Sequence, residues 1–376
     1  MRELGITIYP TVDFDLEECK EYIKKANDQC FSRVFLTFFC VPPQDIANIE
    51  YLKKIKKLSI YAKSLGMKVQ ADFFPEIFDA FKATPQNIQP IVDYGIDEIR
   101  IDGGFTFSEM ALMSQQACCG KIIINASELE DITHTDRSFE EIVHQGIKDF
   151  LESGGIISKI EASHNMYPHE GTGLLMSLLM ERVKLFDEYG ITISAFCNSQ
   201  TYKTTLFNAM DGSPTVEDHR SISAYASTHE LFVSGAVDSV FIADGLVTDE
   251  ELSSLSPLIN EEEIQVRICF HKTATAEEKE HVLKYIHENR QAGYCIRSSH
   301  YRSTVELEPN NTIARHIYDV TIDNKNYERY LAEIQIWLKS FPANLRMNVV
   351  GYIYEEDQQL LKWINNGQKF KFVEIK

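Results

Sequence analysis

The sequence predicts a (β/α)8 TIM barrel followed by a smaller β domain, and two observations support the barrel. Short apolar runs recur along the first two thirds of the chain, and each ends in polar residues; they are residues 4–10, 33–39, 68–74, 98–104, 121–127, 159–165, 191–197 and 239–245. Between successive runs lies a segment long enough for a helix. Strand–helix alternation of this kind is typical of a TIM barrel.

The chain has 376 residues, which is more than a domain with a single hydrophobic core normally contains, so we expect a second domain. We assign residues 1–255 to the barrel and residues 262–376 to this second domain. Strands predominate in it, with predicted segments at 264–270, 294–299, 319–324, 332–338, 347–353 and 370–375, and helical stretches at 275–290 and 357–366. This pattern indicates a small α+β or closed β domain.

Charge and composition exclude several classes of function. The formal net charge of −19 argues against a nucleic-acid partner and against an anionic membrane surface. No apolar run approaches the roughly 18–20 residues of a membrane helix, and the N-terminus lacks the apolar core of a signal peptide. The eight cysteines include no CxxC pair, so neither a disulfide framework nor a zinc site is predicted. We expect a cytoplasmic protein.

Capping signals predict where several barrel helices begin. Ser138 with Glu141, Thr215 with Asp218 and Thr248 with Glu251 have the spacing of a capping box. Thr84 followed by Pro85 predicts a further helix start. The connection 197–214 is about three times as long as the usual βα loop of about 2–6 residues, which favours a lid or binding loop over a surface excursion.

Polar residues at the ends of the predicted strands are the first candidates for chemistry. They are Asp72, Asp102, Asn125, Asn165 and Asp244. TIM barrels place their active sites at the carboxyl ends of the strands, so we predict Asp72 and Asp102 as catalytic. A pair of carboxylates suits glycoside hydrolysis, because one must stay protonated as the acid while the other is ionised as nucleophile or base. Asn125 and Asp244 are predicted to bind substrate.

Strand alternation predicts which charged side chains face the barrel interior. Arg100, Lys159 and Glu161 have inward parity, and buried charges are costly unless they pair or do chemistry. The simplest interpretation pairs Arg100 with a carboxylate and Lys159 with Glu161. Glu161 is also a reserve candidate for catalysis, although it lies deeper in its strand than Asp72 or Asp102.

The segment after the sixth predicted strand offers further groups for a substrate. His164, Asn165 and Tyr167 supply hydrogen-bonding groups of the kind that a sugar needs. Residues 171–173, Gly-Thr-Gly, present backbone amides suited either to an anion or simply to capping a helix. His164 and His169 are spaced i, i+5 without a metal-binding motif, so no metal or other cofactor is predicted.

Cations gather in the second domain of this otherwise acidic chain. They are Arg297, His300, Arg302, Arg315 and His316. Guanidinium groups bind phosphate bidentately, so we predict that Arg297, with Arg315, binds an anionic group of the substrate. The alternative is a set of solvated surface charges.

Several segments together resemble one known family. They are LGITIYP (4–10), HNMYP (164–168), TGL (172–174), GSPTVEDHR (212–220), DVTIDNKNYERYLAEIQI (319–336) and RMNVVG (346–351). In this order they resemble the bacterial 6-phospho-N-acetylmuramidases. The chain departs from the family at Met166, where Phe is commoner, and at Ala332, where Gly is usual.

The resemblance implies a TIM barrel followed by a cyclophilin-like β domain. It also implies cytoplasmic cleavage of the disaccharide N-acetylmuramic acid 6-phosphate–N-acetylglucosamine during cell-wall (peptidoglycan) recycling. The implied partner is thus a small phosphorylated amino-sugar disaccharide, and oligomeric state stays open. Two other functions fit the residues less well: a Schiff-base aldolase that uses Lys159 on sugar phosphates, and a non-catalytic sugar-phosphate binding protein.

Overall fold

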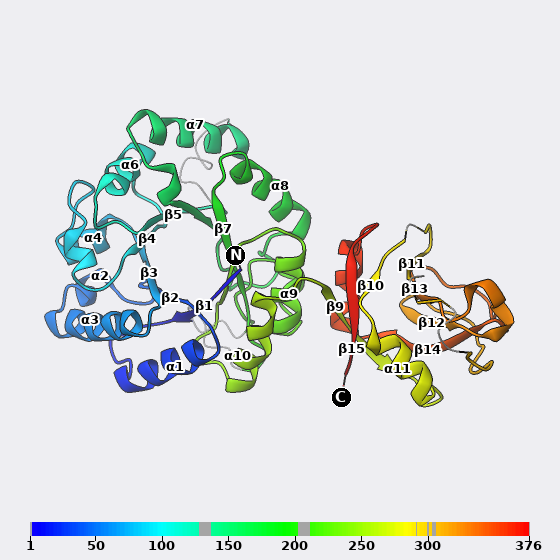
Figure 1. The fold of residues 1–376 in the computed structure, drawn as a ribbon. Coiled ribbons are helices and arrows are strands. Elements are labelled where there is room, and N and C mark those ends of the chain that lie inside the picture. The colour runs from blue at the N-terminus through cyan, green and yellow to red at the C-terminus, as the bar shows by residue number, and fades with distance from the viewer. Residues whose placement is uncertain are drawn as a thin grey trace. The chain divides into compact units, whose positions relative to one another are not determined.

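The computed structural model describes residues 2–127, 137–201, 211–290, 292–298, 301–302 and 306–375. The chain divides into two compact units, Met1–Asn260 and Glu261–Lys376. The first unit is a closed barrel of eight parallel strands ringed by helices, so the predicted fold class is confirmed (Figure 1). The second is a smaller domain built on a seven-stranded sheet.

The barrel strands follow one another around the barrel, and β1 closes it by pairing with β8. They are β1 Glu3–Ile8, β2 Arg33–Leu36, β3 Lys68–Phe73, β4 Glu98–Ile101, β5 Lys121–Asn125, β6 Ile160–Ser163, β7 Thr192–Cys197 and β8 Ser239–Ile242. Each lies inside one of the predicted runs or within a residue of it. The runs extend past the strands at their carboxyl ends, because the polar residues there already belong to the loops at the barrel mouth.

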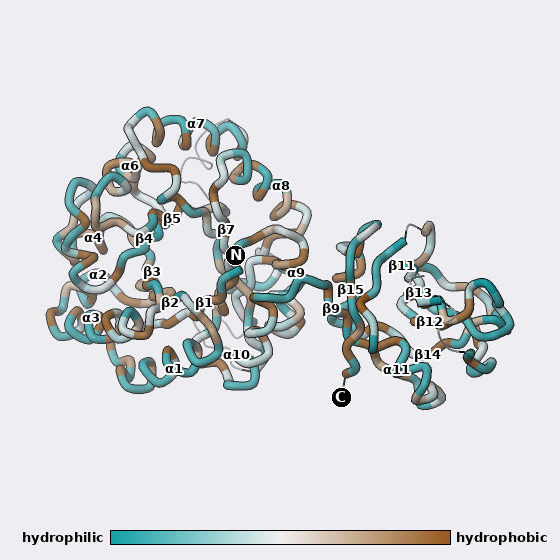
Figure 2. Tube along the Cα trace, viewed as in Figure 1, coloured by the Kyte–Doolittle hydropathy of each residue, from teal (hydrophilic) through white to brown (hydrophobic). Residues whose placement is uncertain are grey.

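The helices pack an apolar side against the barrel, and in Figure 2 they carry both hydrophilic and hydrophobic segments. They are α1 Leu16–Asp28, α2 Pro43–Ile46, α3 Ile49–Ser64, α4 Pro75–Phe81, α5 Gln89–Val92, α6 Phe107–Gln115, α7 Phe139–Glu152, α8 Met176–Asp187, α9 Ala224–Val233 and α10 Asp249–Leu255. Helix α1 shows the principle, since its buried residues follow a helical spacing: Cys19, Tyr22, Ile23 and Ala26.

The predicted helix starts are partly right. Ser138 forms a full capping box ahead of α7, and Thr248 caps α10. The prediction for Thr215 is wrong, because α9 begins only at Ala224, after the cap Ser223. The prediction for Thr84 is also wrong: its backbone pairs with Asn87 in a tight turn, which occupies the groups that a helix start would use.

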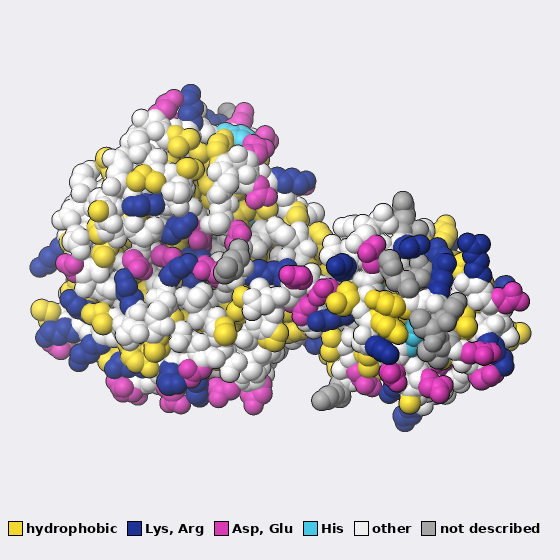
Figure 3. Space-filling view, viewed as in Figure 1, with side chains coloured by type: hydrophobic (Ala, Val, Ile, Leu, Met, Phe, Trp, Pro, Cys, Tyr) yellow, Lys and Arg dark blue, Asp and Glu magenta, His cyan; other side chains and the backbone are white. Residues whose placement is uncertain are grey.

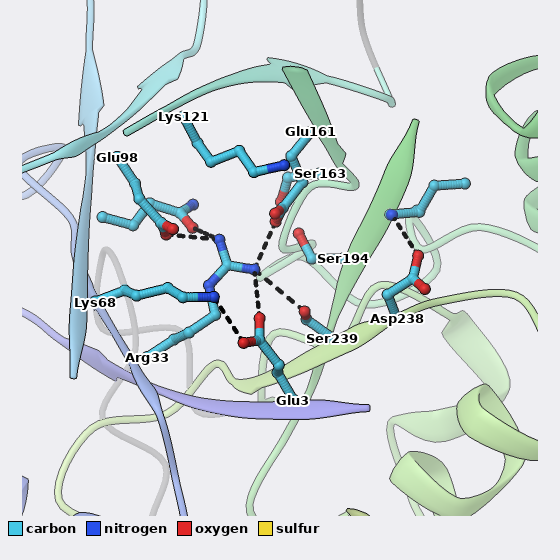
Figure 4. Close-up of polar contacts among 12 residues, drawn as sticks. Glu3, Arg33, Lys68, Glu98, Lys121, Glu161, Ser163, Ser194, Asp238 and Ser239 are labelled. Atoms are coloured by element: carbon cyan, nitrogen blue, oxygen red, sulfur yellow. Dashed lines mark hydrogen bonds and ion pairs between the residues drawn. The ribbon is translucent and has the colours of Figure 1, made fainter. Parts of the chain in front are cut away.

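The barrel interior contains a buried charge network near the amino ends of the strands. The Arg33 guanidinium is fully buried and contacts Glu161 Oε1 and Glu98 Oε2, each at 2.7 Å. It also donates to Ser239 Oγ at 3.1 Å and to Gln70 Oε1 at 3.1 Å. Figure 4 shows the side chains of Glu98, Glu161 and Ser239 converging on the guanidinium from β4, β6 and β8. We call this set the Arg33 network.

An aromatic layer lies next to the Arg33 network inside the barrel. The rings of Phe35, Phe196 and Phe241 pack on one another with centroids 5.7–6.3 Å apart. The Arg33 guanidinium lies 5.0 Å from the centroid of Phe241. Gly5 of β1 makes room for this layer, since a Cβ there would come within 2.3 Å of the Phe241 ring. These rings fill the interior on one side of the network.

One predicted ion pair is wrong. Lys159 does not contact Glu161 but donates from Nζ to the backbone oxygen of Gln116 at 2.9 Å, and it lies in a short 3-10 helix, Ile157–Lys159, before β6 begins. Glu161 pairs with Arg33 instead. Lys159 lies one residue before the start of β6, where the alternation of side chains along a strand no longer applies.

The second domain has a mixed sheet in the order β10-β15-β9-β14-β12-β13-β11. Its elements are β9 Ile264–Phe270, α11 Ala276–Lys284, β10 His287–Glu288, β11 Cys295–Ser298, β12 Asp319–Asp323, β13 Ile334–Trp337, β14 Met347–Ile353 and β15 Lys369–Glu374, with 3-10 helices at Lys325–Tyr330 and Glu355–Trp363. All six predicted strands are present. The cyclophilin-like assignment of this domain stays a prediction.

Ala332 occupies a position in this domain where Gly is usual in the family that the sequence resembles. Its φ of 64° is left-handed, a region that residues with a Cβ adopt at a cost. The backbone N–H of Ala332 donates to the oxygen of Asp323 at 2.9 Å, which holds the turn before β13 in this conformation. The family preference for Gly therefore has a steric reason.

Asp323, at the end of β12, is the most perturbed carboxyl group of the second domain. It is 2% exposed, and its Oδ2 accepts from Nε2 of Gln335 at 3.1 Å. Burial raises the pKa of Asp323 to about 8. The carboxyl group is therefore mostly protonated at neutral pH.

Acidic and basic side chains are intermixed on the surface that Figure 3 shows, without a single-sign field across the barrel. Among the described residues, no helix has the length and apolar character that would span a membrane.

We expect the Arg33 network to be a major determinant of barrel stability. Arg33→Met leaves Glu98 and Glu161 buried without a counter-charge, which should lower the free energy of unfolding by about 3–5 kcal/mol. Urea unfolding measures this. Glu3→Gln is the control, because its partly exposed carboxylate lies 3.8 Å from the guanidinium and should contribute less than about 1 kcal/mol. Equal effects of the two changes would contradict the assignment.

Because the pKa of Asp323 is raised in the folded protein, we expect the free energy of unfolding to depend on pH. The folded protein holds this proton up to about pH 8, whereas the unfolded chain releases it near pH 4, so its contribution to stability is full below about pH 4 and is lost as pH rises through 8. Thermal unfolding should show Asp323→Asn gaining in Tm relative to the unsubstituted protein between pH 5 and pH 8. Asp93→Asn, at an exposed carboxyl, is the control, and a pH-independent difference for Asp323→Asn would refute the prediction.

Candidate active site

Five residues at the carboxyl ends of β4, β5 and β6 form a closed ring of polar contacts. Asp102 Oδ1 lies 2.6 Å from Arg100 Nη1 and accepts from Nδ2 of Asn125 at 3.1 Å. Arg100 Nη2 donates to Oδ1 of Asn165 at 2.5 Å. The backbone N–H of Asn165 donates to Oγ of Ser127 at 2.8 Å, and that of Ser127 donates to Oδ1 of Asn125 at 2.9 Å. We call these five residues the Asp102 ring.

The ring holds Asp102 in a defined orientation while leaving part of it accessible. The Asp102 side chain is 12% exposed, whereas Arg100 is 6% exposed. Arg100 faces inward as predicted and pairs with a carboxylate, so that expectation is confirmed. Its guanidinium also lies 6.0 Å from the centroid of Phe35, in the aromatic layer. Asp102 is thus an ion-paired carboxylate at the edge of a barrel mouth.

Asp72, near the end of β3, is a carboxyl group of a different kind. It is 1% exposed, and it accepts from the backbone N–H of Phe38 at 2.6 Å and from the hydroxyl of Thr37 at 2.7 Å. Burial raises the pKa of Asp72 to about 6, the Phe38 and Thr37 hydrogen bonds oppose this, and the charge of Asp102 adds to it. Asp72 and Asp102 therefore interact electrostatically but have unequal environments, as an acid and base pair requires.

His164 supports the Asp102 ring from outside it. Its Nδ1 lies 3.3 Å from Oγ of Ser127, and the side chain is fully buried. Burial, reinforced by the nearby charge of Arg182, lowers the pKa of His164 to about 3, so the imidazole is neutral at neutral pH. Arg182 in turn donates to the backbone oxygen of Ser127 at 2.7 Å. The geometry gives His164 a positioning function through Ser127, and its predicted contact with substrate stays a prediction.

Tyr167 and Asp244 lie at other points around the mouth. Tyr167 is half-buried, and its backbone oxygen accepts from Arg220 at 3.0 Å. Asp244 is fully buried, and its Oδ2 accepts from the backbone N–H of Ser199 at 2.6 Å. Asp244 thereby fixes the start of the loop after β7, so its predicted role as a substrate ligand stays a prediction.

The predicted amide site at residues 171–173 is already occupied. The backbone N–H groups of Gly171 and Gly173 donate to the two carboxylate oxygens of Glu217 at 2.9 and 2.7 Å. Glu217 also pairs with Arg220. Helix α8 begins later, at Met176, so these amides do not form its start. Residues 202–210 of the predicted lid, 197–214, lie outside the described residues.

Glu161 is not brought together with Asp72 and Asp102. It is the second residue of β6 and belongs to the Arg33 network, whose members lie toward the amino ends of their strands. Asp72 and Asp102 lie at the carboxyl ends of β3 and β4. The geometry therefore gives Glu161 a function in stability. Lys159 precedes the same strand, which removes the geometric basis for a Schiff-base aldolase at the mouth.

The arginines of the second domain are engaged within that domain. Arg297 and Arg302 both pair with Glu333, which is 3% exposed, and both lie over the ring of Tyr330. Arg315 is 6% exposed, with its guanidinium 4.5 Å from the centroid of Trp337. These contacts account for both predicted phosphate ligands as structural groups. Their binding of an anion stays a prediction.

Sequence reasoning did not assign Ser127, Thr37 or Arg182 to the site. Ser127 closes the Asp102 ring, and Thr37 contacts Asp72 from the next strand. Thr37 directly follows the last residue of β2, as Asp102 follows β4, and Ser127 lies two residues after β5, so a search for hydroxyl groups just past the strand ends would have found both. Arg182 acts from α8 and carries no such signal. Within the described ranges, no group of three or more His, Cys, Asp or Glu residues is placed to hold a metal ion.

Together these observations define a (β/α)8-barrel protein with two carboxyl groups in unlike environments at the carboxyl ends of β3 and β4. The chain belongs to the 6-phospho-N-acetylmuramidase family, whose N-terminal region matches residues 4–257 and whose C-terminal region matches residues 264–373. The family resemblance is thereby confirmed, and it supports a glycoside hydrolase. No functionally curated protein matches the chain.

Two solved structures are similar over almost the whole chain. An uncharacterised B. cereus protein is 28% identical with a TM-score of 0.86, and the match covers 99% of each chain. A conserved Enterococcus faecalis protein of unknown function is 24% identical with a TM-score of 0.73, covering 99% of this chain and 96% of that one. The second likeness shows the fold alone.

We predict that Asp72 titrates with a midpoint near pH 6, which 13C NMR of aspartate-labelled protein can measure. Thr37→Val should raise this midpoint further, because the Thr37 hydroxyl stabilises the carboxylate. Thr37→Ser keeps the hydroxyl and is the control. A midpoint near the ordinary aspartate value of about 4 would show that the site is not desolvated as described.

Proposed function

We propose that this protein hydrolyses the disaccharide N-acetylmuramic acid 6-phosphate–N-acetylglucosamine to N-acetylmuramic acid 6-phosphate and N-acetylglucosamine. The observation that carries the proposal is the pair of unlike carboxyl groups, Asp72 and Asp102, at the carboxyl ends of β3 and β4 in a barrel that belongs to the 6-phospho-N-acetylmuramidase family. Hydrolysis of a glycosidic bond needs one protonated and one ionised carboxyl group. A place in the cytoplasm and in peptidoglycan recycling is part of the same proposal.

In the proposed mechanism, Asp72 supplies the proton for the leaving oxygen. Its Oδ1 accepts from a backbone N–H, which leaves Oδ2 as the oxygen that carries the proton. The Thr37 hydroxyl lies 2.7 Å from Oδ2 and can accept that proton's hydrogen bond as well as donate one. A pKa of about 6 keeps part of the population protonated near neutral pH, as a general acid requires.

Asp102 is the proposed ionised partner, acting at the anomeric carbon either directly or through a water molecule. Arg100 supplies its counter-charge, and Asn125 fixes the rotation of the carboxylate. Orientation of this kind lowers the barrier because the reacting oxygen is already in place when substrate binds. Asn125 and Asn165 are proposed to hydrogen-bond the sugar, since amide groups are both donors and acceptors.

Arg297 and Arg315 are the proposed ligands of the substrate's phosphate group. Arg297 places its Nε and Nη2 on Glu333, so Nη1 is the proposed donor to the phosphate. Arg315 is packed between aromatic rings. Arg297→Ala is expected to reduce the preference for the phosphorylated over the unphosphorylated disaccharide, while slow hydrolysis of the unphosphorylated one remains.

We expect Asp102→Asn to lower kcat for the phosphorylated disaccharide by ~10²–10⁴-fold with substrate binding largely intact, and Asp72→Asn to do the same. Release of N-acetylglucosamine measures turnover, and 1H NMR of the new anomeric proton shows whether Asp102 attacks directly or through water. Asp97→Asn, at an ion pair with Lys63 outside the site, is the matched control. Near-normal turnover in both test variants would remove these carboxyl groups from the mechanism.

A further inference from the structure

Two aromatic side chains lie side by side just past the carboxyl ends of β2 and β3. Phe39 lies three residues after the last residue of β2, and Phe74 directly follows the last residue of β3. Their ring centroids are 5.3 Å apart, and the ring planes are inclined by 71°. Phe39 is 44% exposed, and Phe74 is half-buried. We call this pair the Phe39–Phe74 platform.

The residues that directly precede the two platform residues are fully buried aromatic residues. Phe38 and Phe73 are 0% exposed, and their ring centroids lie 6.0 Å apart. Both rings also pack on Phe81, with centroids 5.8 and 5.6 Å away. Adjacent residues of the chain thus divide between a buried aromatic cluster and the platform. The core is already filled by the buried pair, so the platform rings are available for another function.

The backbone holds the platform in place before any ligand binds. The backbone N–H of Val41 donates to the oxygen of Phe38 at 2.9 Å, which makes Phe39 part of a tight turn. Phe74 is the residue before α4, and its backbone oxygen accepts from the N–H of Ile77 at 3.0 Å. A surface that is ordered in advance loses little freedom on binding. The platform therefore has the rigidity that a binding site needs.

The platform adjoins the proposed general acid. The backbone N–H that donates to Oδ1 of Asp72 at 2.6 Å belongs to Phe38, which directly precedes Phe39. Phe74 lies two residues after Asp72 in the chain. A general acid protonates the oxygen that the leaving sugar carries away, so the leaving sugar binds beside the acid. Of the two sugars of the proposed substrate, the leaving one is thus the sugar that the platform should meet.

The chemistry of the platform fits a neutral sugar. N-acetylglucosamine, the proposed leaving sugar, carries no charge, and its ring C–H groups form an apolar face. The faces of aromatic rings are partly negative and attract such C–H groups. This contact needs no cation, which suits a position beside Asp72 in a chain of net charge −19. Aromatic surface next to a few polar groups is the usual composition of a small-molecule site.

We propose that the Phe39–Phe74 platform is the subsite for the leaving sugar, and that N-acetylglucosamine stacks on the exposed ring of Phe39. The inference rests on the proposed function and deepens it, because it assigns a site to the half of the substrate that carries no phosphate. Phe39 is thereby a binding and specificity residue, whereas the proton transfer belongs to Asp72.

The test compares kcat/KM for two substrates that share the phosphorylated ring. One is the 6-phosphorylated disaccharide, and the other is the methyl glycoside of N-acetylmuramic acid 6-phosphate, which has no leaving sugar. Phe39→Ala should lower the ratio of kcat/KM for the disaccharide to kcat/KM for the methyl glycoside by about 10- to 100-fold, because the apolar contact is lost. Phe39→Trp should keep the ratio near that of the unsubstituted protein, since it retains an aromatic face. An unchanged ratio in Phe39→Ala would overturn the inference.

Ile60→Ala is the matched control, because Ile60 is a 48% exposed apolar side chain on α3, away from the carboxyl ends of the strands. If the unsubstituted protein hydrolyses neither substrate, the proposed function fails. Saturation-transfer NMR with N-acetylglucosamine then tests the subsite alone. Transfer from the protein to the sugar ring protons should be clear in the unsubstituted protein and weak in Phe39→Ala, and equal transfer in both would refute the subsite.

Discussion

The ion pair between Arg100 and Asp102 is the interaction on which the barrel mouth depends. It joins a side chain inside β4 to the first residue after that strand, and Asn165 and Asn125 extend it to β6 and β5. A buried guanidinium without partners would cost several kcal/mol, so its neighbours must supply acceptors. Here the acceptors are Asp102 and Asn165, which are also proposed to act on the substrate. Stability of the mouth and orientation of Asp102 therefore come from the same contacts.

Polar and apolar layers alternate along the barrel axis. The Arg33 network lies toward the amino ends of the strands, and the aromatic layer lies between it and the Asp102 ring, with Phe241 over Arg33 and Phe35 beside Arg100. This arrangement separates two sets of buried charges. The partly exposed carboxylate of Asp102 lies at the mouth, whereas the carboxylate of Glu161 is buried in the Arg33 network. Glu161 has a residue type that suits catalysis, but in this position its function is structural.

Much of this architecture could be predicted from the sequence, because strands buried on both sides leave strong apolar runs and a period of two. The inward orientation of Arg100 and Gln70 follows from that period. The pairing of Arg33 with Glu98 and Glu161 could not be predicted, because it depends on which strands face each other across the closed barrel. The same holds for the Asp102 ring, whose backbone donor from Asn165 has no signal in the sequence. Lys159 shows that the inward and outward alternation of side chains no longer applies directly before the first residue of a strand.

A crystal structure of the Asp102→Asn protein with the 6-phosphorylated disaccharide tests most directly whether the glycosidic bond is cleaved at the Asp102 ring. The predicted result places the anomeric carbon within about 3–3.5 Å of the side chain at position 102, or one water molecule away from it. Disaccharide bound elsewhere on the protein, with the Asp102 ring in contact only with solvent, would contradict the account.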